Sequence, residues 1–311
     1  MKCLILGGAG FLGSYLCEYL VSIKSDVYIY ESPNADITRL YNVKDHVNII
    51  RGNFKTENDF CYVLEGMDIV YHLICTSVPK TSNENIIMDL EDNVCATLRL
   101  LDGCIKCHIG KFIFFSSGGT VYGNMIYDKI NEDHPTNPIS AYGVQKLAIE
   151  KYIQLYSHLY QLDYRILRIS NPYGPRQSPF RAQGVIPSFL TSAITERSLE
   201  IWGTGQVIRD YIYIDDVISG INAVVNYCGD YKLFNLGSGN GLSILALIEV
   251  ISTVVKKKLD VIHISGQKQD VVSNVLDISR ICNETKWMPM TGITTGIEYM
   301  FNTWKATNFV D

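Results

Sequence analysis

The chain has 311 residues, of which 47% are hydrophobic and 19% are charged, so it can bury a sizeable core and whole-chain disorder is excluded. Its 27 Lys and Arg residues face 32 Asp and Glu residues, which gives a net charge of −5. With no basic run, this balance argues against a nucleic-acid partner. The apolar stretch Ser243–Val255 is interrupted by Glu249 and too short to span a bilayer, so we expect a packed helix and no membrane partner.

The start of the chain and the cysteines favour a cytoplasmic location. Met1–Gly13 holds one Lys, and its apolar run ends in glycines, unlike a signal peptide. The nine cysteines are scattered and odd in number, as expected for free thiols in a reducing compartment. Cys104 and Cys107 form a lone CxxC pair without the second pair that zinc sites need, so we expect no metal. A redox or metal role stays the alternative for this pair.

Strand-like and helical segments alternate in the first half of the chain. The predicted strands are Lys2–Leu6, Asp26–Tyr30, Asp68–Ile74, Lys111–Phe115 and Tyr164–Ile169, and the predicted helices are Leu12–Ile23, Asp89–Ile105 and Asn137–Leu159. This alternation predicts an α/β fold with a parallel sheet, helices on both faces and right-handed crossovers. The breaker cluster Asn171–Arg176 predicts a domain boundary near residue 170.

Glycines 7, 10 and 13 follow the first predicted strand and open the first predicted helix. Because the three glycines lack Cβ atoms, the backbone N–H groups of Gly7, Gly10, Phe11, Leu12 and Gly13 can approach a pyrophosphate, which the helix dipole also favours. A plain tight turn is the alternative interpretation.

Glu31 closes the second predicted strand, 18 residues after Gly13. A carboxylate at this place binds the ribose hydroxyls of a dinucleotide and repels a 2′-phosphate, so NAD is favoured over NADP. Arg39 lies nearby in the sequence and keeps NADP open, and a solvated glutamate at the end of the strand is the structural alternative.

Tyr142 and Lys146 are spaced i, i+4 in a predicted helix and therefore share one face. A tyrosine with a pKa near 10 becomes a base near neutral pH only with about 4 kcal/mol of differential stabilisation. An ammonium and a nicotinamide cation can supply this, so we expect a lowered pKa at Tyr142. The pair alone is a frequent chance pattern, but here it lies downstream of a nucleotide loop and the hydroxyl-rich segment Ser116–Thr120.

These motifs occur in the order typical of a known family, over nearly the whole chain. The segments involved are Gly7–Gly13, Asn93, Phe115–Gly123, Tyr142–Lys146, Asn171–Arg176, Trp202–Gly205, Arg209–Tyr211, Asp215–Val217 and Asn235–Gly237. On these residues the chain resembles the extended short-chain dehydrogenase/reductases, and among them the nucleotide-sugar 4-epimerases.

The resemblance implies a Rossmann-type doubly wound parallel sheet, residues 1–170, that binds NAD. It further implies a smaller C-terminal α/β domain, residues 171–311, that binds a nucleoside-diphosphate sugar, with some segments returning to the first domain. Tyr142 would take the proton of the sugar 4-hydroxyl and later return it while C4 is oxidised and reduced. A homodimer through the helices Asp89–Ile105 and Asn137–Leu159 is implied by analogy only.

The resemblance also assigns binding residues. Lys146 would hold the nicotinamide ribose, and Asn53, followed by Phe54, stands where the family often has an adenine-binding Asp. Asn171 and Arg209 would contact the sugar diphosphate. The structural alternatives are a turn asparagine at Asn171 and an ion pair of Arg209 with Asp210.

Two positions depart from the family pattern. Epimerases usually carry Ser or Thr where Gly118 stands, so Ser117 or Thr120 must replace that contact to the reacting oxygen. An Arg that grips the diphosphate is replaced by Gln267, with Lys268 beside it as the candidate.

These departures keep a reductase of a nucleotide-linked 4-keto-6-deoxyhexose open as the rival function. A 4,6-dehydratase needs an acid and a base where this chain has Gly119 and Thr120, which argues against it. A non-catalytic nucleotide-binding protein is the third hypothesis, and the intact Tyr142–Lys146 pair argues against it.

Overall fold

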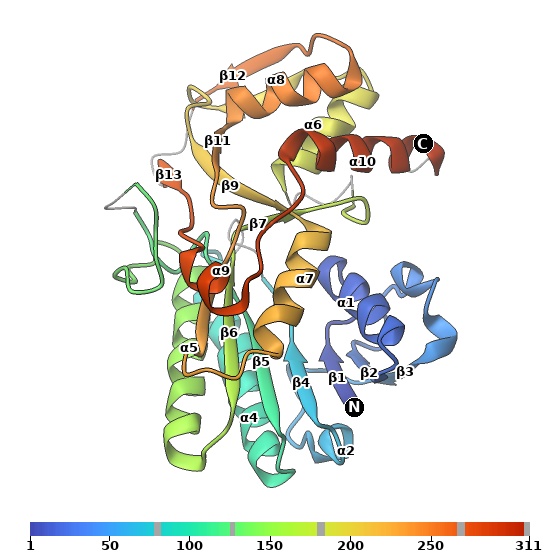
Figure 1. The fold of residues 1–311 in the computed structure, drawn as a ribbon, viewed down its shortest axis with the longest axis vertical. Helices are drawn as coiled ribbons and strands as arrows, with labels where there is room; N and C mark the ends of the chain where they lie inside the picture. The colour runs from blue at the N-terminus through green and yellow to red at the C-terminus, as the bar shows by residue number, and fades with distance from the viewer. Residues whose placement is uncertain (78–81, 125–127, 179–183, 266–270, 308–311) are drawn as a thin grey trace. The chain divides into compact units, whose positions relative to one another are not determined.

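The computed structural model describes residues 1–77, 82–124, 128–178, 184–265 and 271–307. The chain divides into two compact units, whose course Figure 1 traces. Unit 1 comprises Met1–Val121, Thr136–Arg168 and Val224–Phe234, and unit 2 comprises Tyr122–Pro135, Ile169–Ala223 and Asn235–Asp311. Over the described ranges, every helix is too short or too polar to cross a membrane.

A seven-stranded sheet forms the centre of unit 1 (Figure 1). In spatial order its strands are β10 (Leu233–Leu236), β6 (Tyr164–Ile169), β5 (Lys111–Ser117), β4 (Ile69–His72), β1 (Lys2–Leu6), β2 (Asp26–Glu31) and β3 (Val47–Arg51). The pairs of β1 with β2 and β4, of β2 with β3, and of β4 with β5 are parallel. This is the strand order of a Rossmann fold, which confirms the predicted fold class.

Alternation along the strands explains why both faces of the sheet are covered. Leu4 and Leu6 of β1 pack into one core cluster with residues of the helices α2 (Cys61–Leu64), α4 (Ala96–Lys106) and α5 (Ala141–Tyr160). Cys3 and Ile5, which alternate with these leucines along β1, point to the opposite face and are also fully buried. Strands buried on both faces are typical of parallel sheets.

The predicted helix Asp89–Ile105 is interrupted in the structure. It consists of α3 (Ile86–Leu90), a π-helical turn labelled η3 (Glu91–Cys95), and α4. Thr97 Oγ1 donates to the carbonyl of Asn93 at 2.6 Å, a bond that belongs to this turn. The remaining helical elements of unit 1 are α1 (Phe11–Ser22), η1 (Thr38–Leu40) and η2 (Lys44–His46).

Unit 2 contains two smaller sheets. In one, β9 (Ile208–Tyr213) pairs with β7 (Asn171–Tyr173) and β13 (Ser273–Asn274) in parallel and with β11 (Gly241–Ser243) antiparallel. In the other, β8 (Leu199–Trp202) pairs with β12 (Val261–Ile264). The helices are α6 (Val185–Ile194), α7 (Ile214–Val225), α8 (Ile244–Val255), α9 (Ser279–Thr285) and α10 (Ile293–Ala306). The packed helix expected in Ser243–Val255 is α8, with Ser243 as its N-cap.

Candidate active site

The glycine loop joins β1 to the start of α1 and has no room for side chains at its tightest point. A Cβ at position 13 would lie 2.3 Å from the carbonyl oxygen of Gly7, and Gly7 itself has φ +90°. Within the described residues, no side chain caps the N-terminus of α1 at Gly10, and its first turn holds no acidic residue. The loop therefore leaves backbone N–H groups and a positive dipole end for an anion.

Glu31 ends β2 beside this loop. Its Oε1 accepts the N–H of Ala9 at 2.6 Å, and the residue is 8% exposed. Burial raises the pKa of the Glu31 carboxyl, while the Ala9 N–H and the charge of Arg51 oppose that shift. The carboxyl group predicted to bind ribose is thus fixed at the edge of the glycine loop.

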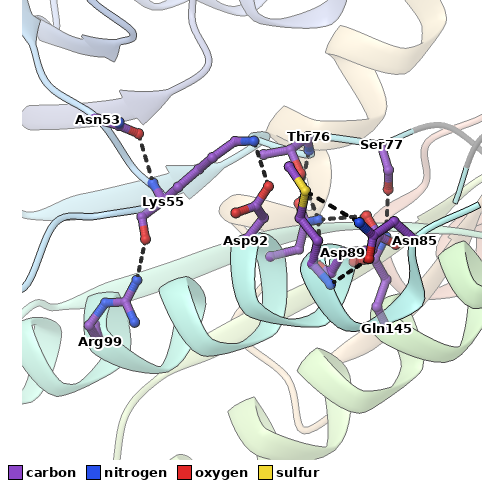
Figure 2. Close-up of polar contacts among 11 residues, drawn as sticks. Asn53, Lys55, Thr76, Ser77, Asn85, Asp89, Asp92, Arg99 and Gln145 are labelled. Carbon is purple, nitrogen blue, oxygen red and sulfur yellow. Dashed lines mark hydrogen bonds and ion pairs between the residues drawn. The ribbon is translucent and has the colours of Figure 1, made fainter.

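Asn53 and Phe54 follow β3 in a short turn. The Oδ1 atom of Asn53 accepts the N–H of Lys55, and the side chain of Asn53 is exposed. The ring of Phe54 is buried, with its centroid 5.6 Å from that of Phe60, so Phe54 can offer only its backbone to a ligand. Arg99 of α4 donates to the carbonyl of Lys55 (Figure 2) and also to that of Glu57, which holds this turn in place.

The π-helical turn fixes the loop that follows β4 (Figure 2). Asn93 accepts the N–H of Thr76 at 2.8 Å and donates to Thr76 Oγ1 at 2.8 Å and to Asp89 Oδ1 at 3.0 Å. Gln145 of α5 donates to Ser77 Oγ at 2.9 Å. The sequence indicated Asn93 only as part of a motif. Its hydrogen bonds between η3 and this loop were not predicted.

Tyr142 and Lys146 lie together near the start of α5. Lys146 Nζ lies 5.8 Å from the centroid of the Tyr142 ring. The ammonium donates to the carbonyl of Phe115 at 2.9 Å, and Lys146 is 3% exposed. A fixed, buried positive charge thus lies beside the phenol.

Burial is the largest influence on Tyr142 and raises the pKa of its phenol above the ordinary value of 10.0. The side chains of Cys75 and Asp89 act in the same direction. These effects oppose the lowered pKa expected from the sequence. The ammonium of Lys146 and the positive end of the α5 dipole favour the phenolate, so Tyr142 depends on positive charge around it to accept a proton.

Ser117 and Thr120 lie at the carboxyl end of β5, around Gly118 and Gly119. Thr120 Oγ1 is buried and has no hydrogen-bond partner among the described residues. A Cβ at Gly143 would lie 2.6 Å from the carbonyl oxygen of Thr120, so Thr120 abuts the first turn of α5. A buried hydroxyl without a partner in the described structure, on a residue that contacts the first turn of α5, is suited to a ligand oxygen.

Glu150, one helical turn beyond Lys146, anchors α5 to the sheet. It is fully buried and accepts hydrogen bonds from Arg168 of β6, at 2.6 Å from Nη2, and from Ser116 Oγ of β5. Breaking a buried ion pair by removing one partner costs about 3–5 kcal/mol. This anchor therefore holds the helix that carries Tyr142 and Lys146.

Unit 2 carries the substrate-binding candidates on neighbouring strands. Asn171 of β7 is paired in register with Tyr211 of β9 and donates to the carbonyl of Asp210 at 2.8 Å. Arg209 donates to the carbonyl of Val271 at 2.7 Å, and the buried carboxylate of Asp210 accepts the N–H of Ser238 at 2.8 Å. The candidate Lys268 lies outside the described residues.

Known proteins resemble this chain in sequence and in fold. The sequence model of the "NAD dependent epimerase/dehydratase family" matches residues 3–237. A UDP-glucose 4-epimerase of Mycolicibacterium smegmatis is 29% identical over 303 residues, covering 96% of each chain. A dTDP-4-dehydro-6-deoxyglucose reductase of Escherichia coli is 31% identical over 317 residues, covering 95% of each chain. The crystal structure of UDP-glucose 4-epimerase from Thermotoga maritima with UDP-glucose has a TM-score of 0.92 and 28% identity, covering 99% of this chain and 100% of that chain.

Proposed function

Since the chain belongs to the NAD dependent epimerase/dehydratase family, we propose that it is an NAD-dependent 4-epimerase of a nucleoside-diphosphate hexose. The substrate is of the UDP-glucose/UDP-galactose type, and the reaction passes through a transient 4-keto sugar. The observation that carries the proposal is the Tyr142–Lys146 pair on α5, in the same unit as the glycine loop. Similarity to UDP-glucose 4-epimerases over the full chain supports it.

The residues of unit 1 fit NAD. NAD, when bound, accepts the hydride of the sugar C4 and returns it. The N–H groups of the first turn of α1 would bind the pyrophosphate, because no N-cap side chain at Gly10 competes for them. Glu31 would bind the adenine ribose and disfavour a 2′-phosphate, Asn53 would contact the adenine, and Lys146 would hold the nicotinamide ribose.

Tyr142 carries the proton transfer. Its phenolate takes the proton of the sugar 4-hydroxyl, and the phenol returns it to the 4-keto oxygen from the same position. The ammonium of Lys146 favours the phenolate against the effect of burial. Thr120 Oγ1, a buried hydroxyl without a partner in the described structure, hydrogen-bonds the reacting oxygen where Gly118 cannot, and Ser117 is the second candidate.

Unit 2 carries the residues that we propose for the nucleotide end of the substrate. Arg209 supplies a guanidinium, which can bind a diphosphate bidentately. Asn171 lies on the neighbouring strand and supplies an amide. Lys268 is the proposed second cation.

Turnover without added cofactor tests the proposal. The purified protein should carry bound NAD and interconvert UDP-glucose and UDP-galactose, followed by NMR or chromatography. UDP-N-acetylglucosamine and UDP-glucuronic acid belong in the same panel, because they change C2 or C6 and leave the chemistry at C4 intact. Absence of C4 inversion on every substrate of the panel would contradict the proposal.

A 4-keto reductase is the second candidate. The similarity to a dTDP-4-dehydro-6-deoxyglucose reductase over 95% of the chain favours it, and so does the glycine at position 118. A reductase requires stoichiometric NADH or NADPH and a 4-keto substrate, whereas an epimerase regenerates its cofactor in every cycle. Counting cofactor consumed per sugar converted separates the two.

We also propose a homodimer. Large apolar side chains are exposed on both long helical segments of unit 1, among them Ile87 at 75% on α3 and Leu159 at 55% on α5. Burying such side chains in a partner removes apolar surface from water. Light scattering coupled to size-exclusion chromatography should give a mass near twice 35.0 kDa.

A further inference from the structure

The start of α5 is capped by side chains from two different parts of the chain. Ser140, the residue just before the helix, accepts the N–H of Gly143 at 3.2 Å. Asn83 Oδ1 accepts the N–H of Ala141 at 2.9 Å, and Ser82 Oγ accepts the N–H of Tyr142 itself at 3.0 Å. Three successive N–H groups of the first turn are therefore bonded to side-chain oxygens.

The two distant caps go beyond what an ordinary helix start requires. One local residue such as Ser140 satisfies the usual N-cap position, and the remaining N–H groups of a first turn can bond water. Here Ser82 and Asn83 lie 60 and 58 residues from their partners, and Ser82 is 1% exposed. They fix the backbone from which the Tyr142 side chain projects.

The three caps are also neutral, and the first turn of α5 contains no acidic residue. Neutral and negative side chains both cap helix starts, and negative ones also interact favourably with the helix dipole. Beside Tyr142 such a charge would disfavour a phenolate. In the part of the chain that the structure describes, the charged or titratable groups found to act on the phenol are Lys146 on α5, Cys75 after β4 and Asp89 on α3.

We propose that Ser82 and Asn83 are positioning residues for Tyr142, which hold the first turn of α5 with neutral oxygens and so fix the phenol without adding a negative charge. The inference rests on the proposed function, because it assigns these residues to the proton transfer at Tyr142. Neither residue touches the reacting atoms in this assignment.

Removal of each cap tests the positioning. Asn83 is exposed, so Asn83→Ala should fold, and Ser82→Ala tests the buried cap. Ser243→Ala is the matched control, because Ser243 caps the N–H of Ala246 in α8, which carries no proposed catalytic group. We expect a similar fall in melting temperature for all three variants, of the size typical for a lost cap.

The kinetic readout separates positioning from stability. We expect kcat to fall about 10-fold in Ser82→Ala and Asn83→Ala, with KM for the nucleotide sugar and the NAD content unchanged, because a misplaced catalytic group affects mainly the chemical step. Ser243→Ala should keep its kcat. If kcat stays at the wild-type value in both cap variants, or if NAD content falls in parallel with kcat, the inference is wrong.

A charge test probes the neutrality of the caps. Asn83→Asp keeps the acceptor for Ala141 and adds a carboxylate, so we expect the acidic limb of the kcat profile to move upward by about 0.5 pH unit. Gly292→Asp is the control, since it puts the same charge at the start of α10, where a side chain meets open space. An unmoved limb in Asn83→Asp would contradict this part of the inference.

The wild-type measurement keeps the two proposals apart. If the wild-type protein binds NAD and inverts C4 but the cap variants behave like Ser243→Ala, only the positioning inference fails. If the wild-type protein inverts no sugar in the panel, the proposed function itself fails.

Discussion

The starts of two helices in unit 1 are built in opposite ways. α1 begins at Gly10 without a side-chain cap in the described structure, and it follows a loop in which a Cβ at position 13 would clash with the backbone. α5 begins with the N–H groups of Ala141, Tyr142 and Gly143 all bonded to side chains. One helix end is left open, and the other is fully occupied.

The difference follows from what each end has to do. An open end presents N–H groups and a positive dipole to a ligand that arrives with negative charge. A closed end cannot bind such a ligand, but it fixes the direction of the side chains in its first turn. In the proposed function, the start of α1 would therefore bind the cofactor, and the start of α5 would hold the reactive side chain in place.

The largest loss of turnover is expected when the hydroxyl of Tyr142 at the start of α5 is removed. Tyr142→Phe removes the hydroxyl that transfers the proton, so turnover should fall by about 10²-fold or more while the fold and bound NAD are retained. Steady-state kinetics and the absorbance of released NAD measure both. Near-normal turnover would remove Tyr142 from the mechanism.

Closing the open end should weaken cofactor binding. Gly10→Asp supplies α1 with a charged cap at a residue whose φ of −68° is open to every residue type, although its Cβ would lie 3.2 Å from the carbonyl oxygen of Gly7. We expect NAD affinity to fall by about 10²-fold relative to Gly10→Ala through repulsion of the pyrophosphate, with a thermal stability no lower than that of Gly10→Ala. Gly10→Ala controls for the added Cβ, and Gly292→Asp controls for the added charge. Equal NAD affinity in Gly10→Asp and Gly10→Ala would show that this helix end does not bind phosphate.

Removing the ammonium beside the phenol should shift the pH dependence. In Lys146→Met the pKa of Tyr142 rises, because burial then acts with less opposition. The acidic limb of the kcat profile should therefore move upward by about 1 pH unit, and kcat at neutral pH should fall about 10-fold. A profile that keeps its shape at lower amplitude would assign Lys146 to ribose binding alone.

The smallest loss of kcat is expected on removal of the Thr120 hydroxyl, which we propose replaces the hydroxyl that Gly118 lacks. Thr120→Val removes Oγ1 and keeps the shape of the side chain, and we expect kcat to fall about 5-fold, the loss of one hydrogen bond to the reacting oxygen. Ser117→Ala is the matched variant and should change kcat less, because the orphaned buried oxygen belongs to Thr120. The reverse ranking would assign the contact to Ser117.

The open end could be predicted from the sequence because all its parts are local. Gly7, Gly10 and Gly13 fall within seven residues, and their chemistry follows from the missing Cβ atoms. The expected strands Lys2–Leu6 and Tyr164–Ile169 are confirmed with their bounds for the same reason. The strand β3, which was not predicted, forms the edge of the sheet and is only partly buried, so its apolar pattern is weak.

The closed end could not be predicted in the same way. Ser82 and Asn83 meet α5 only through the tertiary fold, and their spacing to Tyr142 follows no helix or strand period. The helix Asn137–Leu159 was predicted to start too early, because the caps that begin it at Ala141 were not recognised. The π-helical turn at Glu91–Cys95 was missed because one extra residue hardly disturbs an apolar pattern that continues on either side.

The ion pair at Glu150 also limits how α5 can rotate about its own axis. Steps of four residues advance about 40° around a helix beyond a full turn, so Tyr142 and Glu150 point in directions roughly 80° apart. The Glu150 carboxylate can therefore bind Arg168 and Ser116 inside the protein while the phenol of Tyr142 points in a different direction. A rotation of α5 about its axis would break the buried ion pair between Glu150 and Arg168. The direction in which the Tyr142 side chain points should therefore change little when exposed residues of α5 are substituted.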